Sequence, residues 1–391
     1  MAARNPKPQP EPVVAPVQMS ANPVEAEAGG ILTIDLGAIA ANWRTLMNVT
    51  LPIECAAVVK ADAYGLGIEP VVAALAKAGA RTFFVADLAE ARRVRAIMAH
   101  AMIYVLNGVM PNTAPAFAEV NARPVINGLT EFAEWDAFVT STKWDGGAAL
   151  HVDTGINRLG IAPEDAAALA PRINVEHHGI SLLMSHLACA ETPDHPLNQK
   201  QIRLFREVRL LFRGIPASLA NSSGIFLGPS THNDLVRPGG ALFGSNPTPG
   251  RPNTMQPVID LKARILQVRP VKRRDNVGYG ATWTAMRDSR IAIIAAGYGD
   301  GYLRTAGAAS DKPPGDVIIA GARCPIVGRI SMDLMAVDVT DLPDGAARRG
   351  GFATLIGMSI GVDDVAARAG TIGYEVLTAL GRRYHRVWVN G

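Results

Sequence analysis

The chain has 391 residues, of which 48% are hydrophobic and 19% charged, a composition that supports a sizeable packed core and excludes disorder throughout. At about 150 residues per domain, this length predicts two or three domains. Lys and Arg number 38 against 35 for Asp and Glu, so the charge balance does not indicate a nucleic-acid-binding protein.

Residues 1–28 contain repeated prolines and lack the run of about 7–15 apolar residues that a secretory signal needs. This composition predicts a disordered, Pro-rich tail. No run of about 18 uncharged apolar residues occurs anywhere, so we expect no membrane span. The three cysteines, Cys55, Cys189 and Cys324, lie far apart. Isolated cysteines in odd number are typical of reduced thiols in a cytoplasmic protein, and they form no metal site.

Between residues 29 and 256, short strand-like runs alternate with helical patterns. The runs lie at 53–60, 82–86, 101–106, 123–126, 148–152, 179–185, 217–220 and near 241–243. Eight strands alternating with helices over about 200 residues are typical of an α/β protein with a parallel (β/α)₈ TIM-type barrel. An open doubly wound sheet is the weaker alternative, because no glycine fingerprint follows the first strand.

Residues 257–391 have a different pattern of short strands broken by Gly, Pro and Asp turns, then helical segments at 362–381 and a last strand at 385–390. This pattern predicts a mainly β C-terminal domain. The early strand at 31–36 precedes the barrel strands, and it can pair with this second domain instead.

Lys60 ends the first barrel strand, in the segment AAVVKADAYGLG at 56–67. Desolvation at the end of an apolar strand disfavours a charged lysine, which lowers its pKa and makes the amine nucleophilic. The C-terminal ends of barrel strands are also where active sites lie. A lysine that only reaches from the rim into water is the alternative, and the commoner one from spacing alone.

Two segments rich in Gly and Ser, ANSSGIFLG at 220–228 and LVRPGGALFG at 235–244, follow the last barrel strands. Barrels often bind phosphate there through backbone N–H groups. The residues suited to this use are Ser222, Ser223, Gly224, Gly239 and Gly240, although ordinary turns explain them equally well. A reactive lysine beside a phosphate site is what a pyridoxal phosphate enzyme needs.

Other polar residues carry weaker signals. Arg158, in DTGINRLG, can clamp a carboxylate or be an ordinary loop arginine. His186 stands near the end of the sixth strand, where a lone histidine is more often hydrogen-bonded core than catalyst. His177 and His178 lack the spacing and carboxylate partners of a metal site. The basic cluster at 382–386 is expected to be a solvated face.

From about Ile31 to the C-terminus, the sequence resembles alanine racemase, a pyridoxal phosphate enzyme with a (β/α)₈ barrel and a C-terminal β domain. The matching motifs occur in order, and they are VVKADAYGLG, DTGINRLG, SHLACA, ANSSG, LVRPGGALFG, VGYGATWTA, GYGDGY, GRISMD and IGYEVLTALGRR.

The resemblance implies specific roles. Lys60 carries the cofactor, and Lys60 and Tyr279 are the two catalytic bases. The implied cofactor-binding residues are Lys60, Tyr64, His186, Ser222, Arg237, Gly239, Gly240 and Tyr374. The implied substrate-binding residues are Arg158, Met332, Asp333 and Tyr298. The resemblance also implies a homodimer with shared active sites, in which Tyr279, Tyr298 and Met332 come from the partner subunit.

Two positions depart from the family pattern. His151 stands where many members have a carbamylated lysine that fixes the arginine matching Arg158, and histidine cannot form that group. We expect a bound anion such as chloride beside Arg158 and His151, or else an ordered water. A third alternative is that other side chains hold Arg158 and His151 merely packs. Ser331 replaces a cysteine found in some members, which we expect to be a mild change.

The expected activity is interconversion of L-alanine and D-alanine, which supplies D-alanine for peptidoglycan or serves alanine catabolism. Removing the Cα proton on one face and returning one on the other requires two bases. A racemase of broader specificity, for example for serine, stays open, as does an amino-acid decarboxylase of the same architecture. A non-catalytic pyridoxal phosphate-binding protein is the alternative from another class, but it predicts a single barrel without a second domain.

Overall fold

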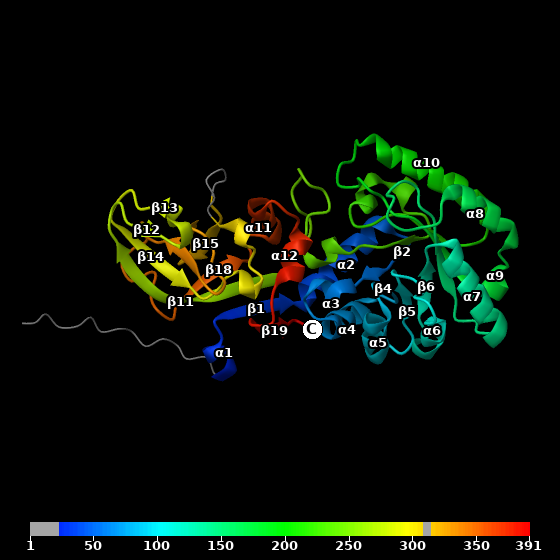
Figure 1. Cartoon of the computed structure of the whole chain (residues 1–391), viewed down its shortest axis with the longest axis horizontal. Coiled ribbons are helices and arrows are strands. Elements are labelled where there is room, and N and C mark those ends of the chain that lie inside the picture. Colours follow the sequence, from blue (N-terminus) through cyan, green and yellow to red (C-terminus); the bar gives the residue numbers. More distant parts are fainter. Residues whose placement is uncertain (1–22, 308–313) are drawn as a thin grey trace, which may run out of the picture.

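The computed structural model describes residues 23–307 and 314–391, which form a helix-covered barrel beside a mainly β domain (Figure 1). Most of the predicted tail lies outside these residues. Its last part is structured, because helix α1 (Pro23–Glu27) begins at Pro23. Arg264 holds this segment by donating to the carbonyl oxygens of Glu25 and Ala28, each at 3.0 Å. Residues 23–28 of the expected tail are therefore part of the described structure.

The predicted (β/α)₈ barrel is confirmed. Seven strands follow one another in parallel, namely β3 (Ala57–Val58), β4 (Thr82–Val85), β5 (Met102–Val105), β6 (Arg123–Ile126), β7 (Ala148–His151), β8 (Ile180–Met184) and β9 (Ala217–Ser218). The closing strand, β10 (Leu235–Val236), pairs in parallel with β2 (Glu54–Cys55), which runs directly into β3. The Asp234 N–H also donates to the Ala217 carbonyl at 2.9 Å. Hydrogen bonds on both sides of β10 thus close the barrel.

The prediction of an eighth strand near 241–243 is wrong. That strand is β10, and residues Gly240–Phe243 instead form the 3₁₀ turn η4. Pro238 lacks an N–H for a sheet ladder, and two glycines follow it, so the strand ends there. The apolar run after the glycines is buried as a short helix. A short apolar run cannot be assigned to strand or helix by periodicity alone.

Helices cover the outside of the barrel because their apolar residues recur at helical spacing. In α4 (Ile68–Ala78), for example, Ile68, Val71, Val72 and Leu75 are all buried, the i, i+3, i+4, i+7 pattern of an amphipathic helix. The others are α2 (Leu36–Thr50), α5 (Leu88–Ile97), α6 (Ala114–Val120), α7 (Leu129–Thr142), α8 (Pro163–Leu169), α9 (Val175–His178) and α10 (Pro196–Leu211). None of the described helices is both long and apolar enough to cross a membrane.

A separate cluster fills the barrel interior. It consists of Ala56, Val58, Phe84, Tyr104, Val125, Ala149, Leu182, Met184 and Leu235, packed apart from the core that joins strands to helices. Because the interior is filled, a ligand has to bind above it, at the rim where the loops begin.

The second domain is built on one eight-stranded sheet with the order β14-β17-β16-β15-β18-β11-β1-β19. The early strand β1 (Gly30–Asp35) joins it, antiparallel to β11 (Ile259–Val271) and parallel to β19 (His385–Val389). The remaining strands are β14 (Ser289–Ile294), β15 (Asp316–Ile319), β16 (Ala322–Val327), β17 (Met335–Asp338) and β18 (Phe352–Ile356), with the hairpin β12 (Asn276–Val277) and β13 (Trp283–Thr284). Helices α11 (Val362–Ala369) and α12 (Gly373–Ala379) follow, and α12 packs against the barrel rim at α3 (Lys60–Tyr64) and η4.

Candidate active site

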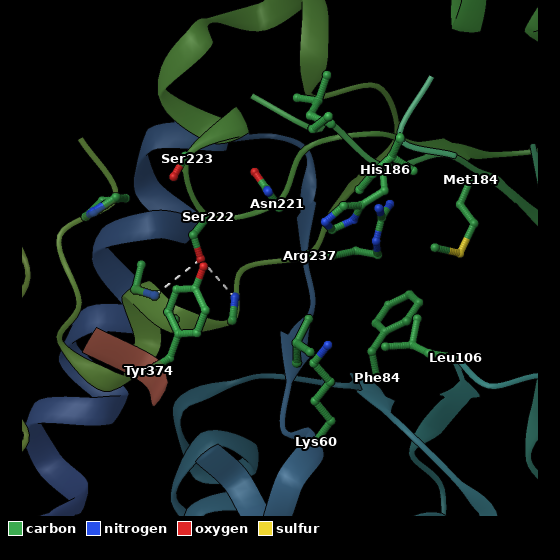
Figure 2. Close-up of a pocket in the computed structure, with 18 of the residues that line it drawn as sticks. Lys60, Phe84, Leu106, Met184, His186, Asn221, Ser222, Ser223, Arg237 and Tyr374 are labelled. Carbon is green, nitrogen blue, oxygen red and sulfur yellow. Dashed lines mark hydrogen bonds between the residues drawn. The ribbon is translucent and has the colours of Figure 1, made fainter. Parts of the chain in front are cut away.

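A pocket of about 520 Å³ opens at the C-terminal ends of the barrel strands, a size suited to a small-molecule cofactor. Figure 2 shows Lys60, His186 and Arg237 at its centre, with Ser222 and Tyr374 to one side. The pocket brings together most of the candidates from the sequence, namely Lys60, Tyr64, Arg158, His186, Ser222, Ser223, Arg237, Gly239, Gly240 and Tyr374. All but Tyr374 come from the barrel; Tyr374 is supplied by α12 of the second domain.

Lys60 begins α3, just after β3, and the chain then makes an unusual left-handed turn. The four residues from Ala61 to Tyr64 have φ between 54° and 56°. For residues other than glycine, this region costs about 1–2 kcal/mol each, so the surrounding structure has to hold it. The turn places Lys60 and Tyr64 on the same rim of the pocket.

Charged side chains hold this turn from two directions. Glu90 Oε1 accepts from the Asp62 N–H at 3.0 Å, and the Asp62 carboxylate pairs with Arg93 at 2.6 Å. From the second domain, Arg386 donates to the carbonyl oxygen of Gly65. The expectation that the basic cluster at 382–386 is a solvated face is therefore wrong for Arg386, which contacts the barrel. Nothing in the local sequence signals its contact, because the two residues lie 321 positions apart.

The electrostatic environment favours a neutral Lys60 amine. Burial lowers the pKa of Lys60 below its ordinary value, and the positive charge of Arg158 lowers this pKa further, while Glu90 partly opposes the shift. A lower pKa raises the fraction of the amine that has a free lone pair, and this neutral form is the one that acts as a nucleophile and a base.

Arg237 is a buried cation at the centre of the pocket, with 4% of its surface exposed. It donates to the Ser185 carbonyl at 2.6 Å and to Ser218 Oγ, and it lies over the Phe84 ring at 5.9 Å. No carboxylate in the described part of the chain pairs with it. Burying an uncompensated cation is costly, so this guanidinium fits a ligand that brings an acceptor, such as an unprotonated ring nitrogen.

His186 lies in the same pocket and is neutral at physiological pH. Burial, reinforced by the positive charges of Arg237 and Arg158, lowers the pKa of His186 to about 3. The positive charge at this point of the site therefore resides on Arg237 rather than being shared by the two residues.

A cradle for an anion lies at the other side of the pocket. Ser222 Oγ accepts from the backbone N–H groups of Gly239 at 3.0 Å and Ala241 at 3.2 Å (Figure 2). Tyr64 reaches the same place, with its ring stacked on Phe243 at 4.6 Å. Convergent hydroxyls and backbone N–H groups are the donors that phosphate groups bind. The residues present therefore fit a cofactor that carries both a phosphate and a ring nitrogen.

Four candidates from the sequence lie outside this pocket, in the second domain. They are Tyr279, Tyr298, Met332 and Asp333. The first three are 72%, 42% and 55% exposed, and Asp333 pairs with Arg383 at 2.7 Å. The Tyr298 N–H donates to the Ser331 carbonyl at 3.1 Å, so Tyr298 and Met332 belong to neighbouring loops.

Asn127 is a further functional candidate, which no sequence motif signals. It follows β6 and accepts at Oδ1, 2.7 Å from His151 Nδ1 at the end of the neighbouring strand β7. Asn127 directly follows the fourth barrel strand and His151 ends the fifth. Because neighbouring strand ends meet at the rim of a barrel, their positions in the sequence are enough to predict this pair.

His177 and His178 do have a carboxylate neighbour, contrary to the expectation from spacing. Asp136 Oδ1 lies 3.1 Å from His178 Nε2 and 3.4 Å from His177 Nε2. This contact joins α7 to α9, and none of the three residues lines the pocket. Sequence spacing fails here because the carboxylate comes from a different helix.

Comparisons with known proteins give consistent findings. The family descriptions "Alanine racemase, N-terminal domain" and "Alanine racemase, C-terminal domain" match residues 34–247 and 258–388. The alanine racemase of Methylobacterium sp. is 51% identical over 362 residues, which cover 93% of this chain and 98% of that protein. The biosynthetic alanine racemase of Agrobacterium fabrum is 43% identical, covering 92% and 93%. The crystal structure of alanine racemase from Bartonella henselae with covalently bound pyridoxal phosphate has a TM-score of 0.87 at 39% identity, covering 93% of this chain and 100% of that one.

Proposed function

The chain belongs to the alanine racemase family, and we propose that it interconverts L-alanine and D-alanine with two bases, Lys60 and Tyr279, in active sites shared by two subunits. Pyridoxal phosphate is the cofactor, and when bound it supplies an electron sink that acidifies the Cα–H bond of the amino acid. The supporting observation is that the pocket contains Lys60 but not Tyr279, whose side chain is 72% exposed.

The pocket residues divide the task of holding the cofactor. Lys60 provides the amine for covalent attachment. Tyr64, Ser222, Gly239, Gly240 and Tyr374 surround the phosphate position. Arg237 would donate a hydrogen bond to the ring nitrogen while keeping its own proton, because a guanidinium does not give one up at physiological pH. His186 packs beside it as a neutral imidazole.

The two bases serve opposite faces of the substrate. Lys60 holds a proton at Nζ on one face, and Tyr279 exchanges one at Oη on the other. Tyrosine has an ordinary pKa near 10, so its phenolate needs a nearby positive charge. In the assembled site Arg237 is the buried cation that provides it, since His186 is uncharged.

The substrate carboxylate binds between the barrel and the partner subunit. Arg158 lines the pocket and supplies the positive charge. Met332, Asp333 and Tyr298 lie outside the pocket of their own chain, which supports their contribution to the pocket of a partner in a head-to-tail homodimer. We place the enzyme in the cytoplasm, where its three free cysteines stay reduced. There it supplies D-alanine for peptidoglycan or acts in alanine catabolism.

Incubation of L-alanine with the purified holoenzyme in D₂O tests this function. The expected product is D-alanine that carries deuterium at Cα. A decarboxylase would instead release ethylamine, and a non-catalytic binding protein would leave both chirality and isotope unchanged. The same assay with L-serine measures substrate breadth, and a rate for serine equal to that for alanine would favour a broader amino-acid racemase.

A further inference from the structure

His151 lines the pocket, and one of its ring nitrogens has no hydrogen-bond partner among the described residues. The side chain is 6% exposed, and its Nε2 is buried without a hydrogen-bond partner among the residues that the structure describes. A buried polar atom without a partner is costly, so it indicates a partner that arrives with a ligand or a moving side chain.

Asn127 determines which kind of partner this nitrogen can take. The Asn127 amide nitrogen donates to the carbonyls of Val125 at 2.7 Å and Leu106 at 3.3 Å. These bonds orient the amide so that its oxygen faces His151 Nδ1 at 2.7 Å. Because that oxygen only accepts, Nδ1 has to carry the proton. In a neutral imidazole the other nitrogen, Nε2, is then a hydrogen-bond acceptor.

The imidazole stays neutral at physiological pH. Burial, together with the charges of Arg237 and Arg158, lowers the pKa of His151 to about 4, although Asp153 partly opposes the shift. A neutral ring with its proton on Nδ1 has no donor to offer an anion. An anion beside Arg158 would therefore receive no hydrogen bond from His151, and the expected chloride ion stays a prediction that depends on Arg158 alone.

Arg158 is the available donor. It lines the same pocket as His151, its side chain is exposed, and it takes part in no ion pair of the described residues. Its loop is fixed just before it, since Asp153 Oδ1 accepts from the N–H groups of Gly155 at 2.8 Å and Ile156 at 3.0 Å. A guanidinium has five N–H donors, enough to bind a carboxylate and a second acceptor together.

We propose that His151 is a positioning residue whose Nε2 accepts a hydrogen bond from Arg158 and so directs that guanidinium at the substrate carboxylate, with no ion between them. The neutral pair Asn127 and His151 then orients the Arg158 guanidinium, as a negatively charged side chain would do at this position. The inference rests on the proposed function, because it takes Arg158 as the group that binds the substrate carboxylate.

The structural test is a crystal structure of the holoenzyme grown in bromide with propionate, which has the carboxylate and carbon chain of alanine without its amine. We expect an Arg158 N–H group about 3 Å from His151 Nε2 and no anomalous bromide peak between the two residues. A bromide ion or a water molecule in that position would overturn the proposal. Racemisation by the same preparation is measured separately. If the enzyme is active but Arg158 does not contact His151, the positioning role of His151 is refuted and the proposed function is not.

Matched variants supply the solution test. His151→Gln keeps a neutral acceptor at nearly the place of Nε2, whereas His151→Leu keeps the bulk and removes the acceptor. We expect His151→Leu to raise the inhibition constant of propionate about tenfold, to raise KM more than it lowers kcat, and to leave the covalent cofactor content unchanged. His151→Gln should stay within about threefold of wild type. Replacing chloride by gluconate at constant ionic strength should change none of these constants.

Two results in solution would contradict the proposal. Equal effects of the two variants would show that His151 contributes only packing. A propionate inhibition constant that depends on halide would assign the role to a bound anion instead. If His151→Leu fails to fold, the His151→Gln variant and the halide series still decide between these outcomes.

Discussion

Gly239 and Tyr64 approach so closely that no side chain fits between them: a Cβ atom on Gly239 would lie 2.2 Å from Tyr64 Oη. The φ angle of Gly239 is −127°, outside the left-handed region that favours glycine. A side chain at position 239 is excluded by the Tyr64 hydroxyl. Glycine therefore leaves room for this hydroxyl in the proposed phosphate cradle.

Gly239→Ala is therefore expected to displace Tyr64 and to weaken pyridoxal phosphate binding about tenfold or more. This is the effect expected when one charge-assisted hydrogen bond is lost. Equilibrium dialysis of the cofactor measures the effect. Gly128→Ala is the matched control, because a Cβ at Gly128 meets nothing within 4 Å. Unchanged cofactor affinity in Gly239→Ala would show that Tyr64 does not contribute to the phosphate site.

Lys60→Ala should abolish covalent attachment of the cofactor. After borohydride reduction of the wild-type holoenzyme, mass spectrometry of its peptides should find the cofactor on Lys60, because this is the lysine that lines the described pocket and burial lowers its pKa. The variant should carry no label. A wild-type protein labelled on another lysine would refute the assignment.

The left-handed turn after Lys60 predicts an unusual response to glycine. Ala61 is exposed and has φ 55°, so Ala61→Gly should relieve strain and stabilise the fold by up to about 1 kcal/mol. Ala73 is exposed in the middle of α4, where the same substitution should destabilise by about 1 kcal/mol. Urea unfolding of both variants measures the difference, and equal losses would mean that the turn is not left-handed in solution.

His151 makes stability depend on pH. Its folded-state pKa of about 4 lies below the ordinary value of 6.5. Between these two pH values the imidazole is protonated in the unfolded chain and neutral in the folded protein. The free energy of unfolding therefore falls as pH drops from about 6.5 to 4, by roughly 3 kcal/mol in total. Below the folded pKa both states are protonated and the contribution becomes constant.

His151→Gln removes this group while His186 remains, so the difference between the two proteins isolates His151. The variant should lose less stability than wild type when urea unfolding is compared at neutral pH and at about pH 4.5. Identical losses would show that the His151 imidazole titrates normally in the folded protein.

The sequence predicts the part of the site that depends on the regular geometry of the barrel. Lys60 and Arg158 are identified because parallel strands bring their C-terminal ends to one rim. The left-handed turn at Ala61–Tyr64 is not predictable, since alanine favours the right-handed helix and only distant contacts such as Arg386 to Gly65 impose the other form.

Tertiary contacts also explain why the tautomer of His151 escapes prediction from sequence. The ring proton is placed by Asn127, 24 residues earlier and on another strand end. The charge and the donor pattern of an imidazole are set by such neighbours, which the local sequence does not show.

The most direct test of the shared two-base site is a mixture of two inactive variants, Lys60→Ala and Tyr279→Phe. In a mixed dimer one site combines the intact Lys60 of one subunit with the intact Tyr279 of the other, and the second site has neither base. After subunit exchange at equal concentrations, the account predicts about a quarter of wild-type activity, since half of the dimers are mixed and each has one competent site. The control mixes wild type with the double variant, whose mixed dimers should be inactive. No recovered racemisation, with subunit exchange demonstrated by mass, would contradict the account.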